Sequence, residues 1–344
     1  MQLKLEFSIG ECIQEMINKD IYAVRLKDNE RLFKSSSGGM FWALAETFVS
    51  RGDAVVCTVY NNITKQAEIQ LIIDRMQLDT AQGSKYMQSI AGDSFHTCVT
   101  WLEQHRNHKL LFVGTGCQAA GFRKFIERKK MRERVLIVDL ICHGSPSPKL
   151  WREYAYMLEK KYHGNIEFVS FKDKRNGWNT PYAYVKIQQK EIQVSDYVNL
   201  FYSGCILRPA CYCCPYATVE RTTDLTIGDF WGIEKVMPDF FNKNGTSLVL
   251  VHTELGIQLF HEIEEKLDVR ESTINECLQP NLIAPTSQSE QRGWFWKMYT
   301  SHGLMYAMHK LFQPSFPWRI KRFVHQQLAM PLRQLFDKLF TSYW

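Results

Sequence analysis

The fold of this chain is decided by residues 109–140, which read KLLFVGTGCQAAGFRKFIERKKMRERVLIVDL. The apolar runs at 109–114 and 135–140 have the length of buried strands, and the segment 118–130 between them is typical of a helix. Short apolar strands that alternate with helices indicate an α/β sheet with helices packed on it. In such sheets ligands bind beyond the carboxyl ends of the strands, where the loops gather.

The same alternation extends outward in both directions. The sequence predicts helices and strands, in chain order, at 40–50, 54–60, 68–73, 148–161, 166–171, 182–187, 224–228, 246–252 and 255–267. The predicted fold class is therefore α/β, a mixed sheet with flanking helices, plus a mainly helical basic C-terminal tail. A shift to aromatic and basic residues near position 286 divides the chain into a domain of residues 1–285 and a tail of residues 286–344.

Composition and charge narrow the class of protein. A chain of 344 residues with 45% hydrophobic and 23% charged residues is typical of a soluble globular protein. It has no apolar run long enough to span a membrane and no secretory signal at its start, so we expect it in the cytoplasm. Residues 291–344 hold eight Lys or Arg residues and one acid, Asp337, whereas the rest of the chain is close to neutral. This distribution argues against nucleic acid as a partner of the body.

Within the tail, apolar residues at 316–340 recur at three- and four-residue steps, and basic side chains mostly lie off that stripe. Such a helix could lie peripherally on the inner face of an anionic membrane. It could equally pack on the body or on a partner helix, and Pro331 interrupts the pattern.

Ten cysteines in a chain without a signal peptide are expected to be thiols in a reducing compartment. Cys205, Cys211 and Cys214 have the spacing C-x5-C-x2-C directly before a predicted strand. Soft thiolates bind Fe–S clusters, zinc or Cu(I), and a zinc knuckle usually has a second C-x2-C unit or a His pair, which this region lacks. The pattern favours an iron–sulfur cluster, with zinc or ordinary free thiols as alternatives. Cys213 is expected to point away from the metal.

A four-iron cluster needs a fourth ligand. Cys117 and Cys142 each follow a predicted strand at a glycine-rich loop that leads into a helix, so their loop tips would converge at one end of the sheet. Either could be the fourth ligand or contact a cofactor, and the sequence does not decide between them. The alternative for each is a small buried apolar residue.

Three Ser/Thr/Gly-rich loops are typical of phosphate-binding sites. Exposed backbone N–H groups, glycines and hydroxyls at a helix N-terminus suit a phosphate, although plain helix caps have the same composition. Three such loops on one sheet favour a dinucleotide pyrophosphate, while the glycine spacing does not match the nicotinamide-binding fingerprint. The candidate residues in these loops are Ser36, Ser37, Gly38, Gly39, Thr115 and His143.

Lysines close to aromatic residues form a further candidate set. Lys172 and Lys174 precede Trp178, and Lys85 precedes Tyr86. Lysines near a flavin could pair with phosphate or stabilise an anionic reduced ring, on which aromatic rings could stack. A charged hairpin turn explains the segment KDKRNG at 172–177 equally well.

Seven stretches carry a family resemblance. They are SSSGGMFWALAETF at 35–48, GSKYMQS at 83–89, VGTGCQAAGFRKFI at 113–126, DLICHGSPSPKLW at 139–151, SFKDKRNGW at 170–178, CILRPACYCCPY at 205–216 and DLTIGDFWGIEK at 224–235. Over these stretches the chain resembles the beta subunits of the coenzyme F420-reducing hydrogenases and dehydrogenases. It is most similar to bacterial members associated with surface-polysaccharide gene clusters.

The resemblance implies a FAD- and [4Fe–4S]-dependent oxidoreductase that passes electrons between a carrier and an unknown substrate, in polysaccharide biosynthesis. The carrier would be a ferredoxin-like protein or a deazaflavin. A non-redox scaffold or accessory protein with a structural metal centre is the alternative. The implied flavin contacts are Ser36, Ser37, Gly38 and Gly39, with Thr115 and Lys172 or Lys174 nearby; the implied iron ligands are Cys205, Cys211 and Cys214, completed by Cys117 or Cys142.

The chain departs from the family pattern at two points. Many relatives begin with a ferredoxin-like segment of C-x2-C-x2-C-x3-C-P runs, which this sequence lacks, so we expect electrons to come from a separate protein or a soluble carrier. In the two loops, Gly116 stands in place of a usual proline and Ser145 in place of another usual residue. These changes would loosen the loops without removing a ligand.

Overall fold

The structure is a computed structural model of the chain and describes residues 20–179 and 182–313. The chain divides into two compact units, one ending at Arg292 and the other beginning at Gly293, and each is described by itself.

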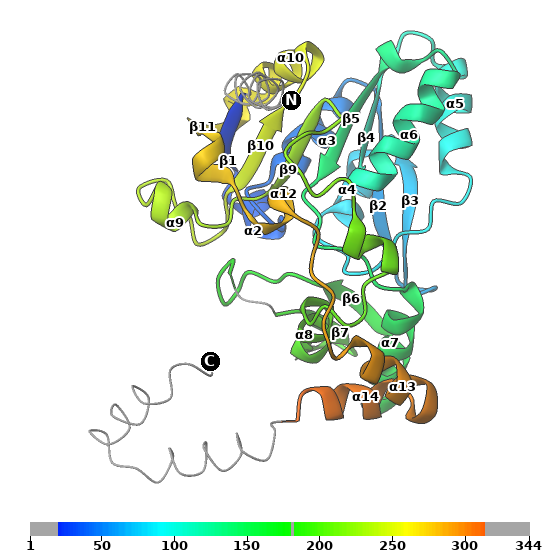
Figure 1. Ribbon diagram of the computed structural model, residues 1–344. Coiled ribbons are helices and arrows are strands. Elements are labelled where there is room, and N and C mark those ends of the chain that lie inside the picture. The colour runs from blue at the N-terminus through cyan, green and yellow to red at the C-terminus, as the bar shows by residue number, and fades with distance from the viewer. Residues whose placement is uncertain (1–19, 180–181, 314–344) are drawn as a thin grey trace, which may run out of the picture. The chain divides into compact units, whose positions relative to one another are not determined.

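The larger unit is built on an eight-stranded sheet with the order β11-β1-β10-β9-β5-β4-β2-β3 (Figure 1). Its strands are β1 (Ile21–Leu26), β2 (Ala54–Asn61), β3 (Gln66–Ile72), β4 (Leu110–Thr115), β5 (Val135–Leu140), β9 (Leu225–Asp229), β10 (Ser247–Val251) and β11 (Leu267–Glu271). The neighbouring strands β9, β5, β4 and β2 run parallel, and all other pairings in this sheet are antiparallel. The predicted mixed sheet is confirmed.

Helices cover both faces of this sheet (Figure 1). One face packs on α3 (Met40–Ser50), α4 (Arg75–Ala81) and α10 (Glu254–Ile263), and the other on α5 (Ser94–Gln104) and α6 (Gly116–Arg128). Strands covered on both faces must be apolar along their whole length, and five of the six residues of β5 are buried. This is why the sequence VLIVDL is a continuous apolar run with one acid, Asp139, near its carboxyl end.

A second layer lies beyond the carboxyl edge of the sheet (Figure 1). It consists of α7 (Pro148–Tyr162), α8 (Ser195–Tyr202) and a three-stranded antiparallel sheet of β6 (Ile166–Ser170), β7 (Tyr184–Ile187) and β8 (Lys190–Gln193). Aromatic rings form the core of this layer, with Trp151 and Tyr197 packed edge to face at 4.9 Å. The layer therefore lies on the side of the sheet from which the loops after β4 and β5 emerge.

Shorter elements complete the larger unit. They are α2 (Asn29–Lys34), α9 (Ile233–Val236), α11 (Ile274–Cys277), α12 (Pro280–Ile283) and the 3-10 turns η1 (Arg132–Arg134), η2 (Pro209–Cys213) and η3 (Glu264–Lys266). The helix predicted at 255–267 ends earlier, at Ile263, and the chain turns through η3 into β11.

The smaller unit contains α14 (Leu304–Leu311) and nearly all of α13 (Arg292–His302). Gly303, with a φ of +82°, separates the two helices. The amphipathic segment predicted at 316–340, with its proposed membrane contact, lies outside the described residues. Among the residues that the structure describes, no helix is both long and apolar enough to cross a membrane.

Candidate functional site

The candidate site lies at the carboxyl edge of the parallel strands. Cys117 is the second residue of α6, directly after β4, and Cys142 follows the neighbouring strand β5 by two residues. Since β4 and β5 are adjacent and parallel, the two loops emerge side by side, as the sequence predicts.

The cysteine-rich segment 205–214 packs against the loop after β5. Pro146 and Leu207 form an antiparallel bridge, and Arg208 N–H donates to the carbonyl of Ser145 at 3.0 Å. Gly144 has a φ of +137°, and a Cβ there would lie 2.6 Å from Leu207 Cδ1, so the approach of the two segments requires a glycine. These contacts fix the cysteine segment relative to Cys142.

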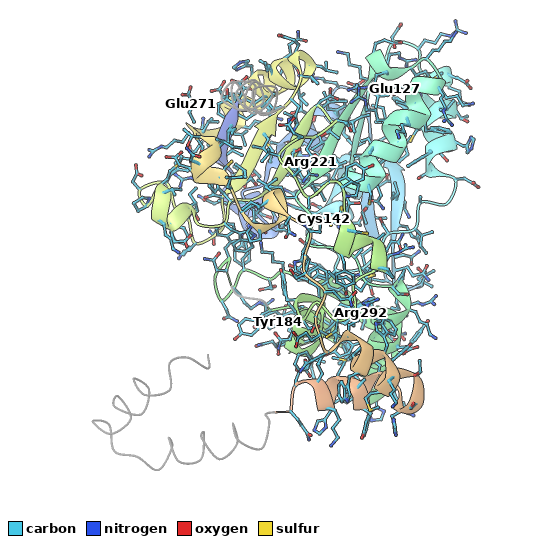
Figure 2. All side chains as sticks on the ribbon, in the orientation of Figure 1. Glu127, Cys142, Tyr184, Arg221, Glu271 and Arg292 are labelled. Atoms are coloured by element: carbon cyan, nitrogen blue, oxygen red, sulfur yellow. The ribbon has the colours of Figure 1, made fainter. Side chains whose placement is uncertain are left out.

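Four thiols from three segments gather at this place: Cys117, Cys142, Cys211 and Cys214. The pKa of Cys142 is raised to about 12, mainly by burial and in part by the charges of the three other thiols, against the effect of the Gly144 backbone. Burial also raises the pKa of Cys214, and Cys117 and Cys211 add to that effect. The four side chains therefore lie within electrostatic range of one another, at the site where Figure 2 labels Cys142.

Backbone N–H groups point at three of these sulfur atoms. Cys211 Sγ accepts from the N–H of Ser145 at 3.4 Å, Cys142 accepts from Gly144, and Cys214 accepts from Tyr216. Cys117 Sγ lies 3.3 Å from the hydroxyl of Thr115. Donors aimed at sulfur stabilise the thiolate and, in an iron–sulfur site, help to set its reduction potential.

Cys205 and Cys213 have different surroundings. Cys205 is fully buried, and its thiol donates to the carbonyl of Ser203 at 3.8 Å. Cys213 is exposed and its thiol donates to the carbonyls of Pro209 and Ala210. The charges that reach Cys142 come from Cys117, Cys211 and Cys214. The choice between Cys117 and Cys142 as the fourth ligand stays a prediction, and the charges of both act within the same group of thiols.

Within the described residues, no three His, Cys, Asp or Glu side chains converge closely enough to hold a single metal ion. The ligands of one zinc ion stand about 3.8 Å apart, as tetrahedral bonds of 2.3 Å require. A cubane cluster spreads its four thiolates over four irons, so its ligands stand farther apart.

A buried ion pair lies against the cysteine segment. Arg221 Nη1 donates to Asp139 Oδ2 at 2.5 Å, and the two side chains are 2% and 1% exposed. Thr223 and Thr226 donate to the other carboxylate oxygen of Asp139. Burial raises the pKa of Asp139, while Arg221 and the hydroxyls oppose that rise. Figure 2 labels Arg221 beside the strands and Cys142 below it, at the edge of the sheet.

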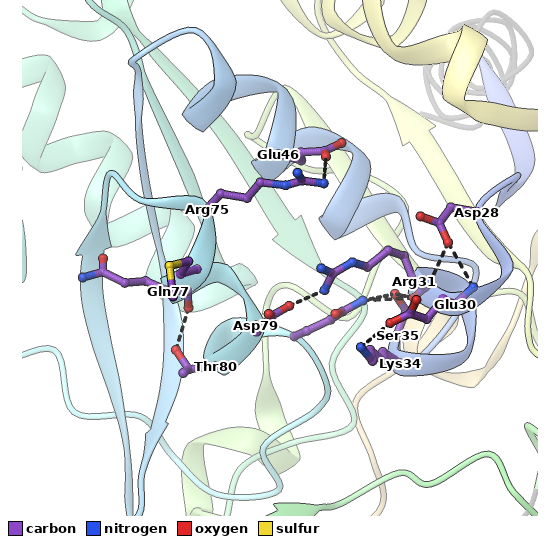
Figure 3. Close-up of polar contacts among 12 residues, drawn as sticks. Asp28, Glu30, Arg31, Lys34, Ser35, Glu46, Arg75, Gln77, Asp79 and Thr80 are labelled. Carbon is purple, nitrogen blue, oxygen red and sulfur yellow. Dashed lines mark hydrogen bonds and ion pairs between the residues drawn. The ribbon is translucent and has the colours of Figure 1, made fainter.

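The serine- and glycine-rich loop 35–39 joins α2 to α3 at the same edge. Figure 3 shows the polar contacts that hold it: Asp28 caps α2 through the N–H groups of Glu30 and Arg31, and Arg31 pairs with Asp79 of α4. Ser35 Oγ accepts from Gln82 at 2.8 Å. The loop is thus anchored to α4 independently of any ligand.

Several predicted flavin contacts in this loop have partners inside the protein. A Cβ on Gly38 would lie 2.2 Å from the carbonyl oxygen of Val24 and 2.4 Å from the nitrogen of Ser247. Gly39 has a φ of +89° and faces Leu26. Both glycines are explained by the close packing of the loop on β1 and β10.

The two serines differ. Ser37 Oγ lies within donating distance of the carbonyls of Gly228 and Thr246, at 3.2 and 3.0 Å. Ser36 Oγ accepts a hydrogen bond from the hydroxyl of Ser84 at 2.8 Å, and both hydroxyls can still accept. Ser36 therefore has more capacity for a ligand than Ser37.

Two of the three candidate lysines use all their donors within the protein. An ammonium has three N–H donors. Lys174 donates to the carbonyls of Leu32, Ser37 and Asn244. Lys85 donates to the carbonyls of Ala81, Gln82 and Gly83. Burial lowers the pKa of Lys174 to about 7 and that of Lys85 to about 8.

Lys172 is different. Its ammonium lies 2.6 Å from Asp229 Oδ2 and 4.6 Å from the ring centre of Trp231. Trp178 stacks on Trp231 at 5.0 Å and donates its indole N–H to Asp229. Burial lowers the pKa of Lys172, while Asp229 opposes that shift. Asp229 is therefore its one hydrogen-bonding partner among the described residues, which leaves donors for a ligand.

His143 lies between the loop that carries Cys142 and the aromatic rings of α8. It follows Cys142 directly, and its ring packs on Phe201 and Tyr202 at 5.1 and 5.2 Å. Its Nδ1 lies 3.2 Å from Thr286 Oγ1, and its buried Nε2 has no hydrogen-bond partner among the described residues. Burial lowers the pKa of His143, while a hydrogen bond with the backbone of Phe201 opposes that shift.

The sequence analysis did not identify Asp139 or Arg221 as parts of the site. An acid inside the apolar strand VLIVDL was a signal, because a buried carboxylate needs a partner. Arg221 gave no signal, since its partner is distant in sequence. Nor did the sequence indicate the hydroxyl pair Tyr86 and Tyr202, whose oxygens lie 3.1 Å apart.

Comparisons with known proteins add two findings. Residues 21–92 match the family profile for the N-terminal part of the coenzyme F420 hydrogenase/dehydrogenase beta subunit, and residues 107–276 match the profile for its C terminus. The chain also superposes, with a TM-score of 0.53 and 15% identity, on a chain of the xenon-derivatised F420-reducing [NiFe] hydrogenase complex from Methanosarcina barkeri. The superposition covers 83% of this chain and 94% of that chain, and at this identity it shows a shared fold. No curated protein matches the sequence.

Proposed function

The chain belongs to the coenzyme F420 hydrogenase/dehydrogenase beta-subunit family, and on this premise we propose that it transfers electrons through a [4Fe–4S] cluster and FAD. The observation that carries the proposal is the gathering of Cys117, Cys142, Cys211 and Cys214 at the carboxyl edge of the sheet. Four thiolates are the ligand set of a four-iron cluster.

The surroundings of these thiols fit a cluster. Soft sulfur ligands select iron–sulfur centres, zinc or Cu(I), and three of the four sulfurs accept backbone N–H groups. Such donors are what an anionic metal–thiolate centre needs in a buried site. We therefore assign Cys117 and Cys142 together as ligands with Cys211 and Cys214, and give Cys205 a packing role.

The proposal of FAD rests on the family and on the residues at the same edge. Ser36, His143 and Lys172 would contact it, because these side chains keep hydrogen-bonding capacity at the ends of the strands. Thr115, whose hydroxyl donates to Gln118 Oε1, would lie nearby. The two groups would let the protein exchange single electrons at iron and pairs of electrons at the flavin. Lys172, whose ammonium pairs with Asp229, would help to balance the negative charge of the reduced flavin.

For the redox partner and the biological process, the proposal names only a class. The M. barkeri structure is of a hydrogenase complex, so we propose that this chain also works with a redox partner, either a ferredoxin-like protein or a deazaflavin carrier. The resemblance to bacterial polysaccharide-cluster members supports a substrate in cell-surface polysaccharide biosynthesis, at the cytoplasmic side of the membrane.

Anaerobic purification with quantification of iron, sulfide and flavin tests the function. We expect a brown protein with about four irons per chain, flavin absorbance, and bleaching by dithionite. Cys211→Ser should lose the iron because it removes one of four ligands. Cys213→Ser is the matched control: it changes an exposed thiol two residues away and should keep the iron.

The result also separates the rival functions. A colourless protein with one zinc per chain would support a structural metal centre in a scaffold or accessory protein. Cys205→Ser tests the ligand set itself: full iron in this variant supports the four thiols named above, and loss of iron with an intact fold would restore Cys205 as a ligand.

A further inference from the structure

The ion pair of Arg221 and Asp139 lies beside Gly116, next to one of the four thiols. A Cβ on Gly116 would lie 2.9 Å from Arg221 Nη1, and Gly116 is bonded to Cys117. The charge of Arg221 is also felt at Cys214, where it favours the thiolate. The guanidinium therefore stands between the segments that carry Cys117 and Cys214.

The pair is oriented by its hydrogen bonds. Asp139 is held on the strand side by Thr223 and Thr226, at 3.0 and 2.5 Å. Arg221 is held by the carboxylate and by the carbonyl of Thr218, which its Nε reaches at 2.8 Å. Both ends of the pair lie beside Gly116, where a Cβ would be 2.9 Å from Arg221 Nη1 and 3.2 Å from Asp139 Oδ2. Arg221 is the member of the pair whose charge acts on Cys214.

We infer that Arg221, positioned by Asp139, sets the reduction potential of the centre held by Cys117, Cys142, Cys211 and Cys214. This inference rests on the proposed function. A four-iron centre with four thiolates becomes more negative when it takes up an electron, and a fixed cation in a buried site stabilises that added charge. Arg221 therefore raises the potential and makes the centre easier to reduce.

A redox titration of the anaerobic protein, followed by the absorbance and electron paramagnetic resonance of the cluster, measures this effect. Arg221→Gln should shift the reduction equilibrium at least tenfold toward the oxidised form, which is about 59 mV for a one-electron couple. Arg221→Lys keeps the charge and should stay within about threefold of the wild type.

Asp139→Asn gives a test of the sign. It removes the negative end of the pair while Arg221 keeps its bond to Thr218, so the potential should move in the opposite direction, toward easier reduction. Loss of structure alone would not produce opposite shifts in the two variants. If Arg221→Gln does not fold, Asp139→Asn decides the question by itself.

The matched control is a second ion pair, half-buried Arg132 with buried Asp224, which also joins the neighbourhoods of β5 and β9. Arg132 precedes β5, whereas Cys142 follows it, and a six-residue strand is about 20 Å long. Arg132→Gln should therefore lower stability without moving the potential.

The outcomes separate the two proposals. A wild-type protein without iron would end the proposed function and the inference with it. An iron-loaded Arg221→Gln whose equilibrium stays within twofold of the wild type would overturn the inference alone. Equal shifts in Arg221→Gln and Arg132→Gln, or shifts of the same sign in Arg221→Gln and Asp139→Asn, would also overturn it.

Discussion

The two halves of the sheet edge treat their polar groups in opposite ways. On the cysteine side, four thiols lie within electrostatic range of one another and the backbone supplies N–H donors to three of them. On the serine and lysine side, most candidate groups are already bonded within the protein: Lys174 and Lys85 each donate to three carbonyls. The cysteine side therefore has groups left to bind a ligand. On the serine and lysine side, most polar groups stabilise the loops of the protein itself.

This contrast shows how to judge whether a residue at the carboxyl edge of a sheet binds a ligand. Residue type and position bring a side chain near a ligand, but its remaining hydrogen-bonding capacity decides whether it can bind one. By this measure Lys172 and Ser36 remain strong candidates for a cofactor, whereas Lys174 and Gly38 have structural roles of their own.

The largest expected effect is that of Gly38→Ala. The new Cβ would lie 2.2 Å from a strand carbonyl and 2.4 Å from a strand nitrogen, and backbone atoms cannot move aside cheaply. We expect a loss of more than about 3 kcal/mol in the free energy of unfolding, measured by urea denaturation. A variant that folds with wild-type stability but loses flavin would show instead that Gly38 is a ligand contact and not a packing glycine.

The sequence predicted the parallel strands well because their burial on both faces leaves an unbroken apolar run. The strand predicted at 135–140 has the same bounds as β5. One missed strand, β1, reads IYAVRL and is mainly apolar, whereas other missed elements are amphipathic or polar. α5 reads SFHTCVTWLEQ and β11 reads LDVRE, and neither has a clear period or a strong boundary signal.

The site was predictable in part, and the reason is geometric. Cys117 and Cys142 each follow a strand, so their place at one edge follows from the fold. Cys205 belongs to an irregular segment after α8, where spacing along the chain does not determine which way a side chain points. The ligand roles of all five predicted cysteines stay predictions until iron is measured.

Lys174→Met tests whether Lys174 stabilises the fold or binds the flavin. It leaves the carbonyls of Leu32, Ser37 and Asn244 without their donor, and we expect a loss of about 2 to 3 kcal/mol in stability. Flavin content should fall no more than the folded fraction does. A selective loss of flavin from a stable protein would contradict the structural role.

The pH dependence of stability gives an independent test of Lys174. Burial lowers its pKa from 10.5 to about 7 in the folded protein. Between these two values the unfolded chain holds one proton more, so the free energy of unfolding should rise with pH by about 1.4 kcal/mol per pH unit. Urea denaturation at two pH values within this window should show that part of the slope in the wild type and not in Lys174→Met.

Gly116→Ala tests the cysteine side. A Cβ there would lie 2.8 Å from Tyr216 Cβ and 2.9 Å from Arg221 Nη1, so the ion pair must shift. We expect a loss of about 1 to 2 kcal/mol in stability and a cluster that is harder to reduce, in the direction of Arg221→Gln. An unchanged potential would separate the position of Arg221 from its proposed effect.

The smallest expected effect is that of Gly121→Ala, and its sign is opposite. Gly121 lies on the exposed side of α6, and a Cβ there meets no atom within 4 Å. Alanine loses less backbone entropy on folding than glycine, so the variant should be more stable by about 0.5 to 1 kcal/mol in urea denaturation. Its iron content and potential should match the wild type, because Gly121 lies a turn beyond Cys117 in α6 and the added Cβ displaces no atom. A change in potential here would mean that the sulfur geometry depends on the whole helix, and the contrast between Gly116 and Gly121 would then fail.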